Sequence, residues 1–154
     1  MAAPVNLWKP EFMLDIDVID EQHKGFFDLC LNSAMLCEAA RSKPVQLSDA
    51  VHLIYGMRAY AFKHFYTEET LLLKYKYPKF YGHICQHDIF LRTLQEVIAE
   101  LNMHLTKVES AGQDAFLACA SHINGYLTNW WGEHILSVDQ EYAHYIREHK
   151  GRAG

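Results

Sequence analysis

The sequence has no run of about 18 apolar residues, and residues 1–10 do not combine a basic start with an apolar stretch. We therefore expect neither an integral membrane segment nor a secretory leader. Cysteine pairs of the Cys-x-x-Cys type are also absent. The four cysteines lie far apart and are interpreted as buried free thiols in a reducing compartment: Cys30, Cys37, Cys85 and Cys119. Together these absences predict a soluble cytoplasmic protein.

Basic stripes of the kind that follow a phosphate backbone are missing as well. The formal net charge is −5 at pH 7, and the acidic residues are scattered along the chain, so we expect no nucleic acid partner. Internal repeats and low-complexity tracts are absent too. The chain has 154 residues, half of them hydrophobic, which suffices for one core. Residues 1–154 are accordingly interpreted as a single domain, and we expect a monomer.

Three breaks, each near a proline or a glycine, interrupt the chain at residues 41–46, 76–82 and 110–113. Between the breaks, apolar residues recur at spacings of three and four, the pattern of amphipathic helices. These segments cover about residues 19–40, 48–75, 82–107 and 113–146. Because long helices with short connections favour antiparallel neighbours, the sequence predicts an all-α fold, an up-down-up-down antiparallel four-helix bundle over about 19–146. Residues 1–18 do not continue the pattern and are expected to form an N-terminal arm across the bundle.

Histidine is unusually abundant, with ten residues in this short chain. On the second segment, His64 and Glu68 are four residues apart, and on the third segment His83 and His87 have the same spacing. Residues four apart project from one helix face, one turn from each other. Each pair could therefore chelate one metal ion.

The first and fourth segments contribute further candidates. His23 shares the apolar stripe of the first segment, and His134 shares that of the fourth. Asp139 follows His134 by five residues, which turns it by about 140° on an ideal helix. Asp139 could therefore join His134 at one site only through a bridging reach or a distortion of the helix.

A polar side chain on an apolar helix face is costly unless something satisfies it. One such histidine is more often an ordinary hydrogen-bonded core residue. Five histidines and two carboxylates on four inward faces, however, would leave many buried donors and acceptors unpaired without metal. The predicted metal ligands are His23, His64, Glu68, His83, His87, His134 and Asp139. Glu69 and Glu133 are expected to point elsewhere. The other histidines are interpreted as surface or structural residues: His52, His104, His122, His144 and His149.

Seven ligands exceed the number that a tetrahedral zinc site takes, and a set without cysteine suits iron, with zinc, copper or manganese as weaker fits. Two ions divide the set naturally. Glu68 and Asp139 could each bridge both ions, because a carboxylate has two oxygens. Five histidines then divide unevenly, so one ion keeps a vacant position that apolar surroundings would make suitable for oxygen.

At these residues the sequence resembles the hemerythrin family, specifically the single-domain bacterial hemerythrins. The resemblance spans about residues 15–145 and rests on Ile-Asp-Glu-Gln-His-Lys at 19–24, His-Phe-Tyr-Thr-Glu-Glu at 64–69, the histidines at 83 and 87, and residues 134–139. It implies the same helical bundle and reversible binding of molecular oxygen at a non-haem di-iron centre, for oxygen carriage, storage or delivery. It also implies two iron ions, Fe²⁺ or Fe³⁺, with an oxo or hydroxo bridge. Carried over by residue, the resemblance implies that the filled iron binds His83, His87 and His134. It implies that the open iron binds His23 and His64, and that Glu68 and Asp139 bridge the two irons.

Reversible binding also needs a dry pocket, because water would let reduced oxygen escape. The predicted pocket residues lie one, three or four positions from ligands: Phe26, Phe65, Trp130, Trp131 and Ile135. For any one of them, ordinary core packing is an equal alternative. Trp130-Trp131 stands where the family more often has Trp-Leu, and Gly132 follows, so the size of the pocket and the rate of oxidation are left open.

Two competing functions are a di-iron oxidase and a sensor of oxygen, redox state or iron. Oxidase-type bundles use a Glu-x-x-His motif from each of two helices, which this sequence lacks at its site. A sensor would need a partner protein to read the bundle surface, since the sequence carries no second domain. We therefore predict a binding protein rather than an enzyme, with weak oxidase or peroxidase activity left open. A recipient of the oxygen would be an oxygen-consuming enzyme.

Overall fold

The computed structural model describes residues 6–43 and 46–150, and these residues form helices and no strand. The elements in chain order are η1 (Pro10–Phe12), α1 (Asp17–Ala40), α2 (Leu47–Lys74), α3 (Phe80–Thr106), α4 (Val108–Ala111), α5 (Asp114–His134), η2 (Ile135–Asp139) and α6 (Gln140–His149). The predicted all-α fold class is confirmed for this part of the chain.

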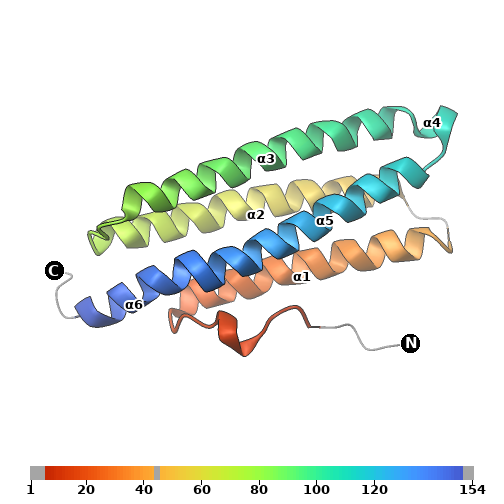
Figure 1. Ribbon diagram of the computed structural model, residues 1–154. Helices are drawn as coiled ribbons and strands as arrows, with labels where there is room; N and C mark the ends of the chain where they lie inside the picture. The colour runs from red at the N-terminus through yellow and green to blue at the C-terminus, as the bar shows by residue number, and fades with distance from the viewer. Residues whose placement is uncertain (1–5, 44–45, 151–154) are drawn as a thin grey trace.

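The long helices lie side by side, with the connections between them at the two ends of the bundle (Figure 1). α1 contacts α2 and α5, and α3 contacts the same two helices. The inward faces of these four helices therefore enclose a common interior.

The inward face of α1 has the predicted spacing of three and four. Its fully buried positions include Ile19, His23, Phe26 and Cys30. Gly25 lies next to this stripe, where a Cβ atom would clash with the hydroxyl of Tyr60 on α2. A glycine here lets α1 and α2 approach closely, beside the buried histidine.

The segment before α1 lies along the bundle (Figure 1). Phe12 stacks on Phe27 with the ring centroids 5.1 Å apart, and Leu14 is fully buried. Asp20 accepts hydrogen bonds from the backbone N–H groups of Leu14 at 2.8 Å and Ile16 at 3.2 Å, which fixes the entry into α1. α1 begins two residues earlier than predicted, and residues 1–5 of the predicted arm lie outside the described residues.

The fourth predicted helix, over residues 113–146, is not one continuous α-helix. α5 ends at His134, residues 135–139 form a turn of π-helix, and α6 continues to His149. A π turn forms i→i+5 hydrogen bonds and so accommodates an extra residue. The prediction assumed 100° per residue throughout, and this assumption is wrong at η2.

All four cysteines are free thiols. Cys30 and Cys37 are buried as predicted, and burial raises the pKa of Cys30 to about 11. Cys85 and Cys119 are only half-buried, so the prediction of buried thiols is wrong for these two. They lie at positions that the neighbouring helices cover incompletely.

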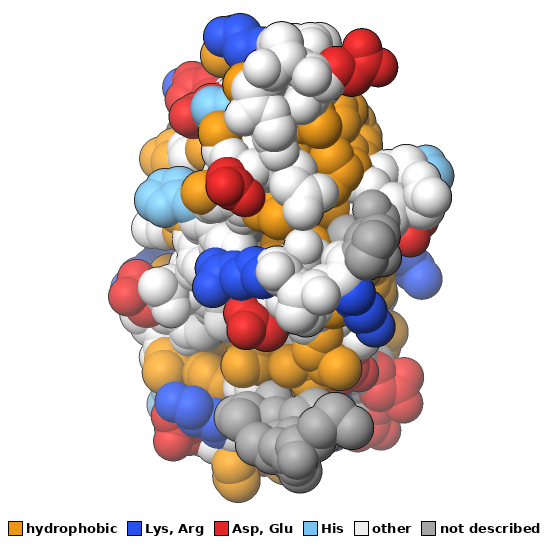
Figure 2. Space-filling view, turned by 90° about the vertical axis from the view of Figure 1, so that its right-hand side faces the viewer, with side chains coloured by type: hydrophobic (Ala, Val, Ile, Leu, Met, Phe, Trp, Pro, Cys, Tyr) orange, Lys and Arg blue, Asp and Glu red, His pale blue; other side chains and the backbone are white. Residues whose placement is uncertain are grey.

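The described part of the chain contains no helix that is long and apolar enough to cross a membrane. Figure 2 shows the end of the bundle on the right of Figure 1, where acidic and basic side chains are interspersed. On this face no patch of one charge sign stands out.

Candidate metal centre

The interior of the bundle contains all seven side chains predicted as metal ligands. Each is at most 5% exposed, and they come from five elements: His23 from α1, His64 and Glu68 from α2, His83 and His87 from α3, His134 from α5 and Asp139 from η2. The structure brings these side chains together. Their role as ligands stays a prediction.

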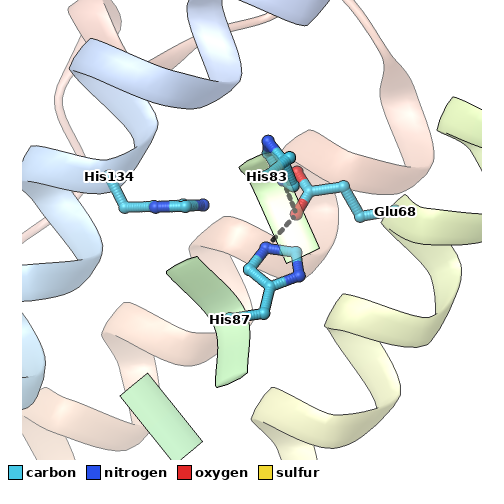
Figure 3. A group of neighbouring side chains, drawn as sticks. All are labelled: Glu68, His83, His87 and His134. Carbon is cyan, nitrogen blue, oxygen red and sulfur yellow. Dashed lines mark hydrogen bonds and ion pairs between the residues drawn. The ribbon is translucent and has the colours of Figure 1, made fainter. Parts of the chain in front are cut away.

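One group consists of three histidines and a carboxylate, Glu68, His83, His87 and His134 (Figure 3), whose ligand atoms lie within 4.8 Å of one another. The Oε2 atom of Glu68 is 3.2 Å from Nε2 of His83 and 3.1 Å from Nε2 of His87. His134 points toward them from the other side of the site (Figure 3). We call this set the three-histidine group.

The second group contains His23, His64 and again Glu68, with ligand atoms within 4.8 Å of one another. Nε2 of His64 lies 3.6 Å from Oε2 of Glu68, and the ring centroids of His23 and His64 are 4.7 Å apart. We call this set the two-histidine group. Because Glu68 belongs to both, the two groups adjoin.

Asp139 faces both groups with its two oxygens. Oδ2 lies 3.4 Å from Nε2 of His23, whereas Oδ1 lies 3.1 Å from Nε2 of His134 and 3.7 Å from Nε2 of His83. The π turn explains this position, because its wider turn returns a residue five places on to the same face. Of the two routes left open by the sequence, the helix distortion is present.

Two side chains beside the groups orient the histidine rings. Nδ1 of His64 donates a hydrogen bond to Oε1 of Gln22 at 3.0 Å, and Nδ1 of His87 donates one to Oε1 of Glu69 at 2.9 Å. Both acceptor oxygens lack a proton to give, so each ring carries a proton on Nδ1 and turns its Nε2 toward the interior. The expectation that Glu69 points elsewhere is therefore wrong. It is 100° around α2 from Glu68, which directs it toward α3 rather than away from the site.

Tyr142 on α6 was not predicted as a site residue. Its side chain is fully buried, and its hydroxyl donates a hydrogen bond to Oε1 of Glu68. Burial, and then the charge of Glu68, raise the pKa of Tyr142 well above its usual value, so the phenol stays a donor. Its position three residues after Asp139, one turn along α6, is a signal that could have identified it.

Burial and the carboxylates act in opposite directions on the histidines. Burial lowers the pKa of His64 to about 3, although Glu68 partly opposes it. Burial alone would also lower the pKa of His87, but interactions with Glu68 and Glu69 outweigh burial and raise it to about 9. In the absence of metal, His64 is therefore neutral and His87 carries a proton.

Burial favours the neutral form of both carboxyl groups as well. Contacts with the surrounding histidines outweigh burial and lower the pKa of each carboxyl group, although the charge of Glu68 adds to burial in raising the pKa of Asp139. Both side chains are therefore anionic in the interior, which is the form that a metal ion requires.

Several buried polar atoms form no hydrogen bond with the described residues. They include both ring nitrogens of His23 and His134, Nδ1 of His83 and both carboxylate oxygens of Asp139. A buried polar atom without a partner costs about 1–3 kcal/mol. Imidazole nitrogens and carboxylate oxygens in two adjoining groups are the donor set of a pair of borderline divalent ions such as iron. The residues present therefore fit two metal ions.

Aromatic rings cover both sides of the site. Trp131 stacks on Phe26 with the centroids 3.7 Å apart and lies 4.9 Å from the ring of His64. Phe65 stacks on His87 at 3.8 Å. Each of the two groups therefore has aromatic rings beside it that exclude water from its histidines.

The five predicted pocket residues divide between the two groups. Phe26 and Trp131 lie beside the two-histidine group, and Ile135 is buried in η2. Trp130 is half-buried and stacks on His134 at 4.3 Å, so it lies beside the three-histidine group, as does Phe65. That these residues form an oxygen pocket stays a prediction.

Comparison with known proteins gives a consistent result. The family model described as the hemerythrin HHE cation binding domain matches residues 14–146, which include all seven side chains. A bacteriohemerythrin of Clostridium acetobutylicum is 30% identical over 139 residues, covering 88% of this chain and 97% of that protein. Bacteriohemerythrins of Stenotrophomonas maltophilia and Pseudomonas aeruginosa are each 26% identical, covering 93% and 92% of this chain and 82% and 81% of those proteins.

Proposed function

Because the chain belongs to the hemerythrin family, we propose that it binds molecular oxygen reversibly at a non-haem di-iron centre, for oxygen carriage, storage or delivery. One observation carries the proposal: the buried side chains form two adjoining groups that share Glu68 and contain unequal numbers of histidines. An ion with two histidines has one protein ligand fewer than its neighbour. Its free position, beside Trp131 and Phe26, is where oxygen would bind.

Each residue of the site has a role in this proposal. The three-histidine group would hold one iron, the two-histidine group would hold the other, and Glu68 and Asp139 would bridge them. When bound, a pair of ferrous ions with an oxo or hydroxo bridge supplies two electrons to oxygen and recovers them on release. Gln22 and Glu69 would hold the histidine rings in place, and the aromatic side chains would exclude water.

The proposal extends to the organisation of the whole chain. We propose an up-down-up-down antiparallel four-helix bundle as a single, monomeric domain with an N-terminal arm. Connections at alternating ends of the bundle support this topology (Figure 1). The cytoplasmic location expected from the sequence stays a prediction.

The test is anaerobic reconstitution of the full chain with ferrous iron, followed by visible spectra through repeated cycles of oxygen and argon. We expect about two irons per chain and a coloured band that appears with oxygen and fades under argon. His64→Ala and Glu68→Ala, which each remove one side chain of the two-histidine group, should lose iron and colour. A band that fails to form with two irons bound would contradict the proposal.

Di-iron oxidase activity is the alternative that a specific contact favours. The phenol of Tyr142 donates a hydrogen bond to Glu68, and a phenol beside a di-iron site can itself be oxidised. In that case the colour would form once and persist under argon, and an added electron donor would be consumed. Sensing would give the reversible colour together with a partner protein that binds only one form.

A further inference from the structure

A second group of metal-ligating side chains lies in a groove between α3 and α5. The carboxylate of Glu100, the imidazole of His104 and the thiol of Cys119 have ligand atoms within 4.8 Å of one another. The groove has a volume of about 310 Å³ and is also lined by His122. From His87 to Glu100 along α3 is about 20 Å at 1.5 Å per residue, so this groove is separate from the candidate di-iron centre.

The helix spacing presents these side chains in two pairs. Glu100 and His104 are four residues apart on α3, and Cys119 and His122 are three apart on α5. Both spacings put the two side chains of a pair one turn apart on the same face. α3 and α5 contact each other, and Oε1 of Glu100 lies 3.8 Å from Nε2 of His104. The two pairs therefore line the same groove.

The groove is open to solvent, and its side chains have room to move. Glu100 and His122 are exposed, whereas His104 and Cys119 are half-buried, and two alanines contribute to the lining. Burial, and then the charge of Glu100, raise the pKa of Cys119. Without a metal ion the thiol therefore keeps its proton.

We propose that this groove binds one divalent cation of the zinc type through Glu100, His104, Cys119 and His122. Thiolate and imidazole are the ligands that Zn²⁺ prefers, whereas Mg²⁺ and Ca²⁺ prefer oxygen ligands throughout. Zinc bonds of about 2.0–2.3 Å put the ligand atoms about 3.5 Å apart, so Glu100, His104 and Cys119 close in by small rotations, and His122 turns in from the lining of the groove as the fourth ligand. On binding, the S–H bond of Cys119 breaks, a sulfur–zinc bond forms and the proton passes to solvent, with no change of oxidation state.

The site would connect α3 to α5 near the α4 turn. Histidines 104 and 122 were interpreted from the sequence as surface or structural residues, because neither has a partner on a core stripe. The partner of His104 is an exposed carboxylate four residues earlier, and the thiol comes from a different helix. Only the contact between the two helices reveals the group.

The experiment uses the iron-loaded full chain, kept under argon and titrated with Co²⁺ as a spectroscopic probe for zinc. We expect one Co²⁺ per chain in addition to the iron, with a sulfur-to-cobalt charge-transfer band in the near ultraviolet that Zn²⁺ abolishes. Cys119→Ser should lose the band, and His104→Ala and His122→Ala should each weaken Zn²⁺ binding about tenfold or more. Cys85→Ser is the matched control, since it removes the other half-buried thiol, which lies on α3 outside the groove, and should leave the band unchanged.

Equal Co²⁺ binding by the unaltered chain and by Cys119→Ser would overturn the proposal, as would a band lost in Cys85→Ser instead. Zn²⁺ affinity in His122→Ala equal to that of the unaltered chain would remove His122 from the ligand set. Iron content and thermal melting without added Co²⁺ or Zn²⁺ are measured for each variant. Because the groove lies on the surface, both should be unchanged, which separates this proposal from the di-iron one.

Discussion

Trp131 holds a buried indole N–H beside the two-histidine group, and its Nε1 forms no hydrogen bond with the described residues. A buried donor without a partner favours any ligand that can accept from it, by about 1 kcal/mol. Bound oxygen would be such an acceptor. We predict that Trp131→Phe, which keeps an aromatic ring but removes the N–H, releases oxygen about five times faster. Stopped-flow mixing of the oxygenated protein with dithionite measures this rate.

Trp130→Phe is the control for this comparison, because the ring of Trp130 stacks on His134 of the three-histidine group. Its oxygen release should be close to that of the unaltered chain. If both variants release oxygen at the original rate, the N–H of Trp131 does not reach the ligand.

His87 illustrates a cost of orienting a ligand with a carboxylate. Glu68 and Glu69 overcome the effect of burial and raise the pKa of His87 to about 9, so the metal-free ring is protonated below that pH. Because iron must displace this proton, the affinity of the site for iron should increase as the pH rises toward about 9. Calorimetric titration with ferrous iron near pH 7, in buffers of different ionisation enthalpy, counts the protons released.

Glu69→Gln tests the cause of this proton release. The variant keeps a hydrogen-bond acceptor for Nδ1 of His87 but removes a negative charge, so fewer protons should leave at the same pH. Proton release that is the same in both proteins would show that Glu69 does not hold the proton on His87.

At this scale the sequence identified ligand candidates better than the residues that support them. His23 and Glu68 share helix faces with apolar residues, which a periodic pattern detects. Gln22 and Glu69 each lie next to a predicted ligand but turn toward a neighbouring helix. Their partners are set by how two helices pack, and one helix's own periodicity contains no such information.

Among the elements, η2 matters most for the site. The helices over residues 17–40, 47–74 and 80–106 follow from apolar periodicity and from the glycines and prolines between them. The π turn does not, because the sequence of η2 has no proline or glycine that would mark an irregularity. It was detectable only as a conflict, since Asp139 would face away from His134 on an ideal helix.

A π turn accommodates one residue more than an α-helix of the same length, so removing one residue should restore an ordinary helix. We predict that deletion of Leu136, which is 46% exposed, leaves the chain folded and able to bind iron. The residues before and after η2 would keep their faces, with His134 and Asp139 then four apart. Iron per chain and the thermal melting curve measure the result.

Deletion of Gly125 is the matched control, because this exposed residue lies within the regular α-helix α5. Removing a residue there rotates the rest of the helix by about 100°, which turns both His134 and Asp139 away from the interior. Iron binding should be lost. If the Leu136 deletion loses iron to the same extent, η2 does not absorb an extra residue.

On the scale of the whole molecule, the segment before α1 covers the part of the bundle that contains η2. η1 contacts η2, and Nε2 of Gln140 donates hydrogen bonds to the carbonyls of Glu11 at 3.1 Å and Met13 at 3.2 Å. Arg147 on α6 donates to the carbonyl of Leu14 at 3.3 Å. The segment before α1 is thus hydrogen-bonded to α6, and the sequence alone did not predict these long-range contacts.

The buried polar groups also determine how the whole fold should respond to loss of iron. The interior contains five histidines and two anionic carboxylates with few hydrogen-bond partners, an unfavourable arrangement unless metal is bound. Since metal binding energy is folding energy at such a site, we predict that chelation of the iron lowers the melting temperature by about 10 °C or more. Calorimetry under argon compares the iron-loaded and iron-free chains. Glu68→Ala should show no such difference, and His144→Ala, which alters an exposed histidine of α6, should show the full difference. Equal melting of the two forms of the unaltered chain would mean that these side chains do not bind the metal.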